Sequence, residues 1–459
     1  MNDARPSRLS PEERAQLLDR LSSRTVQAGS PPPNARVAVQ NRDDLANLPF
    51  FQQMQVMRSA GASLGIADPY FRVHEARAGA ETLIEGRIYD NFSSYDYLGL
   101  NGRSEVAEAA KAAIDRYGTS PSASRLVAGE RPLHQALEQN LAAFHGVEAC
   151  LTFVSGHATN VTVIGHLLRA GDLIIHDELI HNSVLQGAQL SGARRFGFAH
   201  NEVQAAENLL STHGKTGGRT LIVIEGHYSM DGDLPDLRGF IDLARRYNAW
   251  LLVDEAHALG VLGATGRGVA EHFGVDPAEV DLWMGTLSKT LAGCGGYLAG
   301  RREMIDYLKF SAPGFVYSVA MSPPLAAAAL AALDVLQREP ERVGKLNANA
   351  RTFLDAAQAG GLNTGRSEGF AIVPIVTGSS IKAARLSEAL FQRSINVQPI
   401  LYPAVPERSA RLRFFLSSEH SRAQIEGAVQ ALVEETAAIK TQSLDLGALV
   451  QTLSAPEPS

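Results

Sequence analysis

Asp254 and Lys289 are the side chains whose types and surroundings best suit chemistry at a dry site. Asp254 stands in LLVDEAH, directly after an apolar run that should be buried on both faces of a sheet. A buried carboxylate without a partner is costly, so a cationic group should meet it. Lys289 follows in GTLSKTLAGCGG, where small residues let the backbone approach a phosphate and Thr286 and Ser288 add hydroxyls. The two segments predict a buried site that binds a phosphate and places a cation beside Asp254.

Three further groups are candidates for the same site. The segment SGHATN (155–160) joins the strand-like run CLTFV to a helix, and the N–H groups of a helix start form a natural anion site. His181 in DELIHNSVL follows another strand end, and His257 closes the LLVDEAH run. Each of these features alone is more often a tight turn or an ordinary surface histidine, so only their combination argues for function.

The elements that must position these groups alternate along the chain. From about residue 105 to 300, short apolar β-rich runs are separated by longer amphipathic stretches, which predicts a mostly parallel sheet with helices on both faces. Ligands of such sheets gather at the carboxyl ends of the strands. The runs are LIIHD (173–177), TLIVIE (220–225), WLLVD (250–254) and DLWMG (281–285), with His176, Glu225, Asp254 and Gly285 at or near their ends.

The remaining chain is organised differently. An Ala-rich helix is expected around 323–337, and after it FAIVPIVTG, SINVQPILYP and RLRFFLS alternate with helical segments, the last entered through a Ser421–Gln424 capping box. Residues 9–21 form a capped amphipathic pattern followed by the linker AGSPPPNAR, which either docks on another protein or packs as a structural tail. The predicted domains are a helix and Pro-rich linker (1–36), an N-terminal segment (37–104), a large α/β domain (105–337), a smaller α+β domain (338–440) and a tail (441–459).

Composition narrows the class of protein. Of the 459 residues 45% are hydrophobic and 20% charged, as in globular proteins, and the net charge of −7 gives no reason to expect nucleic acid as a partner. No run is long and apolar enough to span a membrane, and the start lacks the apolar core of a signal peptide. The two cysteines exclude a disulfide framework. We expect a cytoplasmic protein without an integral membrane segment and without a metal site.

A rival interpretation comes from DEAH, which is also a Walker B signature of helicase-type NTPases. A P-loop should accompany it, but the Gly214-Lys215-Thr216 segment has Leu209 where the motif needs glycine. A third possibility is a non-catalytic subunit of an acyltransferase heterodimer, against which the retention of Lys289, Asp254 and His257 argues.

Taken together, five blocks resemble the α-oxoamine synthases, a family of pyridoxal-phosphate (PLP) enzymes that includes serine palmitoyltransferase and aminooxononanoate synthase. The resemblance runs from about Asn91 to Glu434. It implies a PLP-dependent transferase fold of type I and a homodimer. It also implies decarboxylative condensation of serine, glycine or alanine with an acyl-CoA or an acyl-carrier protein to give an α-amino ketone. The blocks are SGHATN, DELIHNSVL, IEGHYSMDGD, LLVDEAHALG and GTLSKTLAGCGG.

The resemblance also assigns roles to individual residues. Lys289 matches the lysine that carries PLP, Asp254 the carboxylate that keeps the pyridine nitrogen protonated, and His257 the contact of the phenolic oxygen. His181 matches the imidazole stacked on the ring and Arg413 the arginine that grips the amino-acid carboxylate, although Arg411 would point the same way on a strand. The phosphate cradle and the ring-oxygen hydroxyl are matched by Ser155, Gly156, His157, Thr286 and Ser229.

Three positions depart from the family pattern. Tyr95 replaces a substrate-contacting asparagine of the aminooxononanoate synthases, as in serine palmitoyltransferases. Leu401 stands where several members place a further arginine, which makes carboxylate binding depend more on Arg413. Val319 and Ala320 replace hydroxyl residues that reach the phosphate across the dimer interface, with Ser318 and Ser322 nearby. The sequence therefore does not decide between serine, glycine and alanine as the amino-acid substrate, or between CoA and an acyl-carrier protein as the acyl carrier.

Overall fold

The computed structural model describes residues 44–63, 65–214 and 217–441. The chain divides after Ala60 into two compact units. Of the first, the structure describes η1 (Asp44–Asn47) and most of α2 (Pro49–Ser63). The predicted helix at 9–21 and its linker lie outside the described residues. Everything below concerns the second unit.

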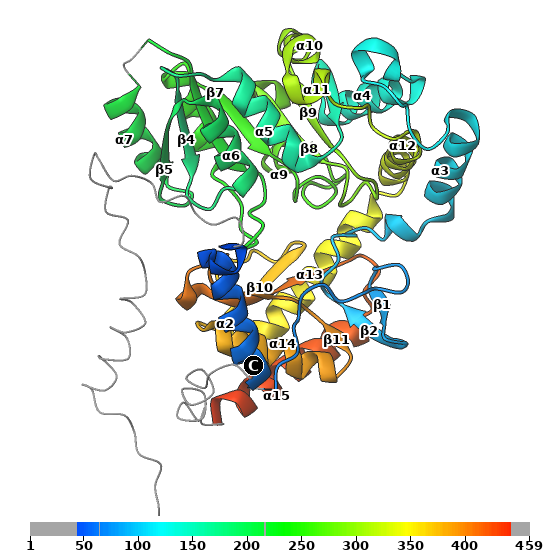
Figure 1. Ribbon diagram of the computed structural model, residues 1–459, viewed down its shortest axis with the longest axis vertical. Helices are drawn as coiled ribbons and strands as arrows, with labels where there is room; N and C mark the ends of the chain where they lie inside the picture. Colours follow the sequence, from blue (N-terminus) through cyan, green and yellow to red (C-terminus); the bar gives the residue numbers. More distant parts are fainter. Residues whose placement is uncertain (1–43, 64, 215–216, 442–459) are drawn as a thin grey trace, which may run out of the picture. The chain divides into compact units, whose positions relative to one another are not determined.

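The largest sheet of this unit has seven strands, several of which are labelled in the upper half of Figure 1. Its strand order is β3-β9-β8-β7-β6-β4-β5. The pairs from β8 through to β5 are parallel, whereas β9 runs antiparallel to both of its neighbours. The strands are β3 (Ala149–Phe153), β4 (Leu173–Asp177), β5 (Arg194–Phe198), β6 (Thr220–Glu225), β7 (Trp250–Asp254), β8 (Leu282–Thr286) and β9 (Gly296–Gly300). The predicted mostly parallel sheet is confirmed.

Helices cover both faces of this sheet, which explains why its strands read as continuous apolar runs. Along β6, Leu221 and Val223 join one buried cluster, while Ile222 and Ile224 join another. The helices of this part are α3 (Ser104–Tyr117), α4 (Pro132–His145), α5 (Gly156–Leu167), α6 (Asn182–Ser191), α7 (Val203–His213), α8 (Leu237–Arg246), α9 (Val269–Phe273), α10 (Arg302–Ser311), α11 (Pro313–Val316) and α12 (Pro323–Arg338). Short turns are η2 (Leu100–Gly102), the π-helical η3 (Arg125–Gly129) and η4 (Pro277–Glu279).

Two smaller sheets complete the unit. One has the order β10-β13-β12 and is antiparallel throughout, and the other has the order β1-β2-β11. Their strands are β10 (Ile372–Val376), β12 (Pro399–Ile400), β13 (Arg411–Phe415), β1 (Glu81–Ile84), β2 (Arg87–Asn91) and β11 (Ile395–Asn396). Both β10 and β13 fall inside runs that the sequence predicts as strands.

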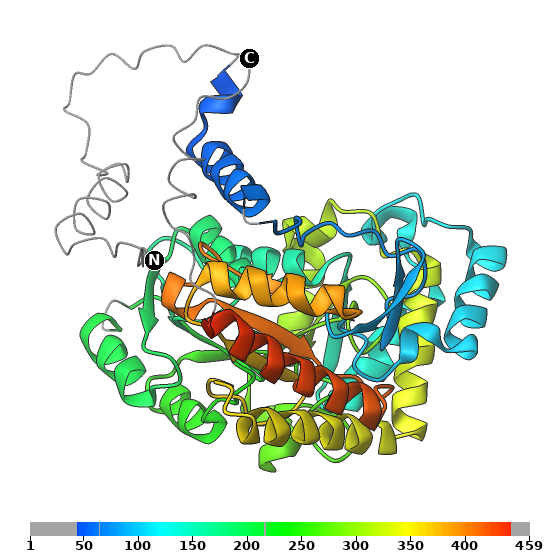
Figure 2. The ribbon, with the colours of Figure 1, turned by 90° about the horizontal axis from the view of Figure 1, so that it is seen from below.

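Helix α15 (Arg422–Thr441) lies between α13 (Glu341–Ala359) and α14 (Ser380–Gln392) (Figure 2). It begins at the predicted capping box: the Ser421 N–H donates to Gln424 Oε1 at 2.9 Å, and the Gln424 N–H donates to Ser421 Oγ at 3.3 Å. A short turn, η5 (Glu407–Ser409), precedes β13. The predicted boundary at 337/338 stays a prediction, since both sides of it belong to one compact unit.

Both cysteines are free; Cys150 is buried and Cys294 exposed. Within the described ranges, no helix is long and apolar enough to cross a membrane.

Candidate active site

The parallel strands deliver polar side chains to one edge of the large sheet. Asp177, Glu225, Asp254 and Thr286 are the last residues of β4, β6, β7 and β8. All four are at least 90% buried, and Glu225 pairs directly with Asp254 in the β6–β7 register. The apolar runs dictate the strands, and the strands bring these groups together. The sequence predicts this for Glu225 and Asp254, whereas β4 and β8 each end one residue after the predicted His176 and Gly285.

Asp254 is held by a chain of hydrogen bonds that ends on His181. Its Oδ1 accepts from the Ala256 N–H at 2.9 Å, and its Oδ2 accepts from Asn160 Nδ2 at 2.9 Å. The same Asn160 amide donates to Ser183 Oγ at 3.0 Å, and Ser183 Oγ lies 2.7 Å from His181 Nδ1. Because the Ser183 N–H also points at this ring nitrogen, at 3.3 Å, Nδ1 acts as an acceptor. Sequence reasoning places Asp254 and His181 here but misses Asn160 and Ser183, which link them.

Lys289 lies on the loop after β8, with its ammonium nitrogen 5.8 Å from the centre of the Tyr95 ring. Burial lowers the pKa of Lys289 to about 8, against the opposing influence of the charges on Asp254 and Glu225. A larger fraction of this amine is therefore uncharged near neutral pH than in an exposed lysine. An unprotonated lysine near two carboxylates can act as a nucleophile toward a carbonyl group and can accept a proton.

A cradle of small groups stands at the start of α5. Ser155 is its N-cap, and Ser155 Oγ accepts from the Ala158 N–H at 3.4 Å. A Cβ on Gly156 would lie 2.9 Å from Thr286 Oγ1, so only glycine lets these two segments approach so closely. Ser288 Oγ lies 2.7 Å from that same Thr286 oxygen, which donates to Gly295 O at 3.0 Å. A helix start beside two hydroxyls suits a phosphate.

The two remaining predicted cofactor contacts lie close to these groups. The His157 ring is exposed and stands edge-on to the His181 ring, with 6.3 Å between the centroids. Ser229 is buried on the loop after β6, and its backbone N–H donates to Glu225 Oε2 at 3.1 Å. The roles of these two residues stay predictions.

His257 is enclosed by aromatic rings. Its ring stacks at 9° on Phe415 with centroids 6.3 Å apart, and Tyr95 stands edge-on at 6.1 Å. Its Nδ1 lies 2.7 Å from the hydroxyl of Tyr97. Burial, then the charges of Lys289 and Arg413, hold the pKa of His257 well below its usual value. The imidazole is therefore neutral at physiological pH.

The two arginines of β13 have different surroundings. Arg411 pairs with Asp231 Oδ1 at 2.8 Å and also donates to Ser409 O and Met230 O. Arg413 donates from Nη1 to Ser229 O at 2.9 Å, while its buried Nε has no hydrogen-bond partner among the described residues. An unpaired buried donor on a guanidinium suits an incoming carboxylate. The geometry therefore favours Arg413 over Arg411 for that role.

Glu225 is a further site residue that sequence reasoning notes only as a strand end. Its Oε1 is buried and has no hydrogen-bond partner within the described chain. Burial and the charge of Asp254 raise the pKa of Glu225 to about 8. The position of Glu225 at the end of a buried strand is the one signal that could have identified it.

The glutamate of DEAH is not available for magnesium. Both carboxylate oxygens of Glu255 accept from the Val269 N–H, at 3.1 and 3.4 Å. A Cβ on Gly268 would lie 1.9 Å from Glu255 Oε2, so this carboxylate packs against the backbone before α9. Among the described residues, no group of histidine, cysteine or acidic side chains could hold a metal ion.

Comparisons with known proteins agree with this geometry. The family of aminotransferases of class I and II matches residues 88–432. The 8-amino-7-oxononanoate synthase of Thermosipho melanesiensis is 40% identical over 361 residues, which cover 79% of this chain and 92% of that protein. The chain belongs to the α-oxoamine synthases. Among the α-oxoamine synthases, the Geobacter sulfurreducens 8-amino-7-oxononanoate synthase is 42% identical over 357 residues, covering 77% of this chain and 90% of that protein.

Solved structures of this family show the same fold. The serine palmitoyltransferase of S. paucimobilis, solved with a bound PLP–myriocin adduct, has a TM-score of 0.82 and 28% identity, covering 87% of this chain and 100% of that one. The predicted type I fold and the prediction of an acyltransferase of the α-oxoamine synthase family are thus confirmed. The interpretation as a DEAH-type NTPase is wrong, because the acidic pair of that motif serves different purposes in this fold.

The residues of the site fit the group that this family implies. A PLP molecule needs a phosphate cradle, an amine, a carboxylate for its ring nitrogen and a donor for its ring oxygen. The start of α5 together with Thr286 can form the phosphate cradle, and Lys289 has the amine. Asp254 has the carboxylate, and His257 can be the donor to the ring oxygen. Glu225 Oε1 and Arg413 Nε have no hydrogen-bond partner among the described residues, so both can form hydrogen bonds with a bound molecule.

Proposed function

We propose that this α-oxoamine synthase binds PLP at Lys289 and joins serine, glycine or alanine to an acyl thioester, whose carrier is CoA or an acyl-carrier protein. The products are an α-amino ketone, CO₂ and the free thiol. The observation that carries the proposal is the Lys289 amine, which has a pKa of about 8 and shares one site with the buried carboxylate of Asp254.

The chain's own residues divide the work of holding PLP. Ser155, Gly156, His157 and Thr286 take its phosphate, Asp254 its ring nitrogen, and His257 and Ser229 its ring oxygen, while His181 forms a wall of the site. When bound, PLP withdraws electrons from Cα of the attached amino acid. Asp254 supports this by keeping a proton on the ring nitrogen, a task for which Asn160 and Ala256 fix the orientation of the carboxylate.

Lys289 and Arg413 act on the amino acid. Arg413 binds its carboxylate, and positioning of that kind contributes strongly to rate because it fixes which bond at Cα is broken. Lys289 Nζ removes the Cα proton. Cα then forms a bond to the thioester carbonyl as the C–S bond breaks, and loss of CO₂ and return of a proton to Cα complete the reaction.

A small amino acid with one carboxylate suits this site. Arg411 is already paired with Asp231, so Arg413 is left to bind a carboxylate group. The Tyr95 ring stands edge-on to both His257 and Phe415 and limits the space beside them. Tyr95 is 40% exposed, which leaves it accessible to a substrate. Because the resemblance gives serine palmitoyltransferases a tyrosine at this position, serine is the first of the three amino acids to test.

We also propose a homodimer. Apolar side chains gather on the π-helical turn and on the segment from α10 to α12: Val127 is 81% exposed, Tyr317 86%, Phe310 71% and Val319 48%. A surface of this kind marks an interaction site. The hydroxyl of Ser322 donates to Thr119 O within its own chain, and that of Ser318 to Val319 O. We expect a dimer in light scattering, and an active monomer at working concentration would contradict the proposal.

The function is tested with the purified protein loaded with PLP. Borohydride reduction followed by peptide mapping should place the label on Lys289, and Lys289→Ala should fold without acquiring it. Each of glycine, alanine and serine is then added in D₂O. The physiological amino acid should perturb the visible absorption and exchange its Cα hydrogen fastest. A label on another lysine would overturn the assignment, and no exchange with any of the three would favour a non-catalytic subunit.

A further inference from the structure

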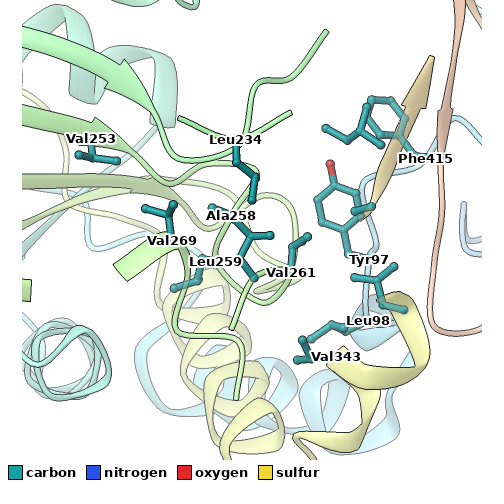
Figure 3. Packing of buried hydrophobic residues seen from close by; sticks show 14 of the residues in the cluster. Tyr97, Leu98, Leu234, Val253, Ala258, Leu259, Val261, Val269, Val343 and Phe415 are labelled. Atoms are coloured by element: carbon teal, nitrogen blue, oxygen red, sulfur yellow. The ribbon is translucent and has the colours of Figure 1, made fainter. Parts of the chain in front are cut away.

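Tyr97 is a buried core residue whose hydroxyl group reaches His257 in the candidate active site. It follows β2 in the segment FSSYDYLGL, is fully buried, and its ring lies between Leu98 and Phe415 (Figure 3). The loop after β7 contributes Ala258 and Val261 to the same cluster. The hydroxyl oxygen of Tyr97 lies 2.7 Å from Nδ1 of His257, a residue 160 positions away in sequence.

The hydrogen atoms of this pair can be assigned by counting donors. A neutral phenol has one hydrogen to donate, and a buried hydroxyl rarely leaves it unused. Among the described residues, the contact with His257 Nδ1 is the one hydrogen bond that the Tyr97 hydroxyl makes. If Nδ1 carried a hydrogen, it would donate to the hydroxyl oxygen, and the buried hydroxyl hydrogen would be left with no acceptor among the described residues. Nδ1 is therefore the acceptor, and a neutral His257 carries its proton on Nε2.

The charge state agrees with this assignment. Burial raises the pKa of Tyr97 well above its usual value, so the phenol keeps its hydrogen. Burial and the charges of Lys289 and Arg413 keep His257 neutral. A charged imidazolium would donate from Nδ1 to the Tyr97 oxygen and again leave the buried hydroxyl hydrogen without an acceptor.

Other contacts fix the direction in which the ring points. Phe415 stacks on one face and Tyr95 stands edge-on. The backbone is held as well, because His227 Nδ1 lies 3.1 Å from His257 O. Nε2 of His257 makes no hydrogen bond within the described chain. Unlike Nε2 of His227, it is not among the fully buried atoms that lack a partner, so it stays accessible from the site. The ring thus presents an N–H with no protein acceptor.

We infer that Tyr97 is a positioning residue, which holds His257 in the Nε2–H form so that this N–H donates to an oxygen acceptor bound in the site. The inference rests on the proposed function, in which the acceptor is the ring oxygen of PLP. A histidine free to change tautomer would offer a lone pair to that oxygen for part of the time and repel it. The Tyr97 hydroxyl removes this alternative.

The direct test uses protein labelled with ¹⁵N in its histidine rings, without PLP. Long-range ¹H–¹⁵N correlation identifies the protonated nitrogen of each ring, and His257→Asn assigns the His257 signals. In the unsubstituted protein, His257 should show a bare Nδ1 and a protonated Nε2. Tyr97→Phe should lose that pure state and give a mixture with the Nδ1–H form.

Tyr297→Phe is a matched control. Tyr297 is also fully buried, and its hydroxyl lies 2.8 Å from His145 Nε2, so this change removes the same kind of hydrogen bond from a buried Tyr–His pair. It should leave the His257 signals as they are. In PLP-loaded protein, Tyr97→Phe should shift the balance of visible absorption bands in the direction that His257→Asn does, and Tyr297→Phe should not.

The possible outcomes separate the inference about Tyr97 from the proposed PLP-dependent function. A protonated Nδ1 in the unsubstituted protein would overturn the inference even if Tyr97→Phe failed to fold. An unchanged tautomer in Tyr97→Phe would overturn it as well. If the unsubstituted protein took up no PLP, the proposed function would fail, whereas the tautomer measured without PLP would still stand or fall by itself.

Discussion

Two neighbouring regions at the carboxyl edge of the sheet contain buried histidines and carboxylates, yet they differ in how these groups are paired. In the first, the His200 cluster, His200 Nδ1 lies 3.0 Å from Asp177 and Nε2 lies 2.7 Å from Asp233. Asp177 also accepts from the Tyr228 hydroxyl and from the N–H groups of Leu179 and Asn201. With a carboxylate at each nitrogen, His200 must be an imidazolium.

The second region, the Asp254 cluster, comprises Asp254, Glu225, Lys289, His257 and Arg413. Here Glu225 Oε1 and Arg413 Nε have no partner among the described residues, and burial lowers the pKa of Lys289. In the first region every charged group faces an opposite charge, although Asp233 Oδ1 itself makes no hydrogen bond among the described residues. In the second region Glu225 and Arg413 make no ion pair with each other or with another described residue, and unpaired buried groups of this kind can bind a ligand. The comparison teaches that the pairing of a buried charge, and not its burial, separates structural from chemical roles.

The largest expected effect is that of Asp254→Asn. An amide cannot keep a proton on the ring nitrogen of PLP, so we expect Cα hydrogen exchange to fall by roughly 10²–10⁴-fold, the size of a general acid–base contribution. The packing remains, but the amide can accept from only one of Ala256 N–H and Asn160 Nδ2, so we expect a modest drop in the urea midpoint. Cα exchange is measured by NMR in D₂O, and undiminished exchange in a variant that retains PLP would contradict the role of Asp254.

Asp177→Asn is the matched control from the other region, since it makes the same chemical change at the end of β4, which is separated from β7 by β6 in the same sheet. It leaves a buried imidazolium with one carboxylate fewer, and breaking such a pair costs about 3 kcal/mol. We expect a clear drop in the urea midpoint and a smaller loss of Cα exchange per folded, PLP-loaded molecule. If Asp177→Asn and Asp254→Asn lowered the urea midpoint and the rate of Cα exchange in the same proportion, the distinction between the two regions would be wrong.

A smaller effect should appear in the pH dependence of stability. Burial alone would lower the pKa of His200, but its hydrogen bonds to Asp177 and Asp233 and their charges raise it to about 10. Because the folded pKa lies above the usual value of 6.5, the stabilisation is fully present below pH 6.5 and is lost as the pH rises through 10.

The measurement compares urea midpoints of the unsubstituted protein and His200→Gln from pH 6 to 10.5. Other groups titrate in both proteins, so the difference between them isolates His200. We expect the gap to narrow as the pH rises. A gap that stays constant over this range would mean that His200 is not an imidazolium in the folded protein.

Much of the framework could be predicted from the sequence, for reasons that are local. Strands β4, β6 and β7 are continuous apolar runs because both faces of each strand are buried, and the Ser421–Gln424 box marks the start of α15 through residues three positions apart. The five motifs identify the family. Through it they indicate Lys289, Asp254 and His181, because these residues stand at fixed places in short segments.

Other features depended on the tertiary structure. Strand β9 is not among the predicted strands, and its terminal glycines are required by close packing: a Cβ on Gly300 would lie 2.4 Å from Asp281 O. Arg411 and Arg413 are equivalent on a strand until Asp231 pairs with one of them. The contacts of Asn160 with Asp254 and of Tyr97 with His257 join residues 94 and 160 positions apart. Such pairs leave no periodic trace in the sequence, because packing alone brings their atoms within hydrogen-bond distance.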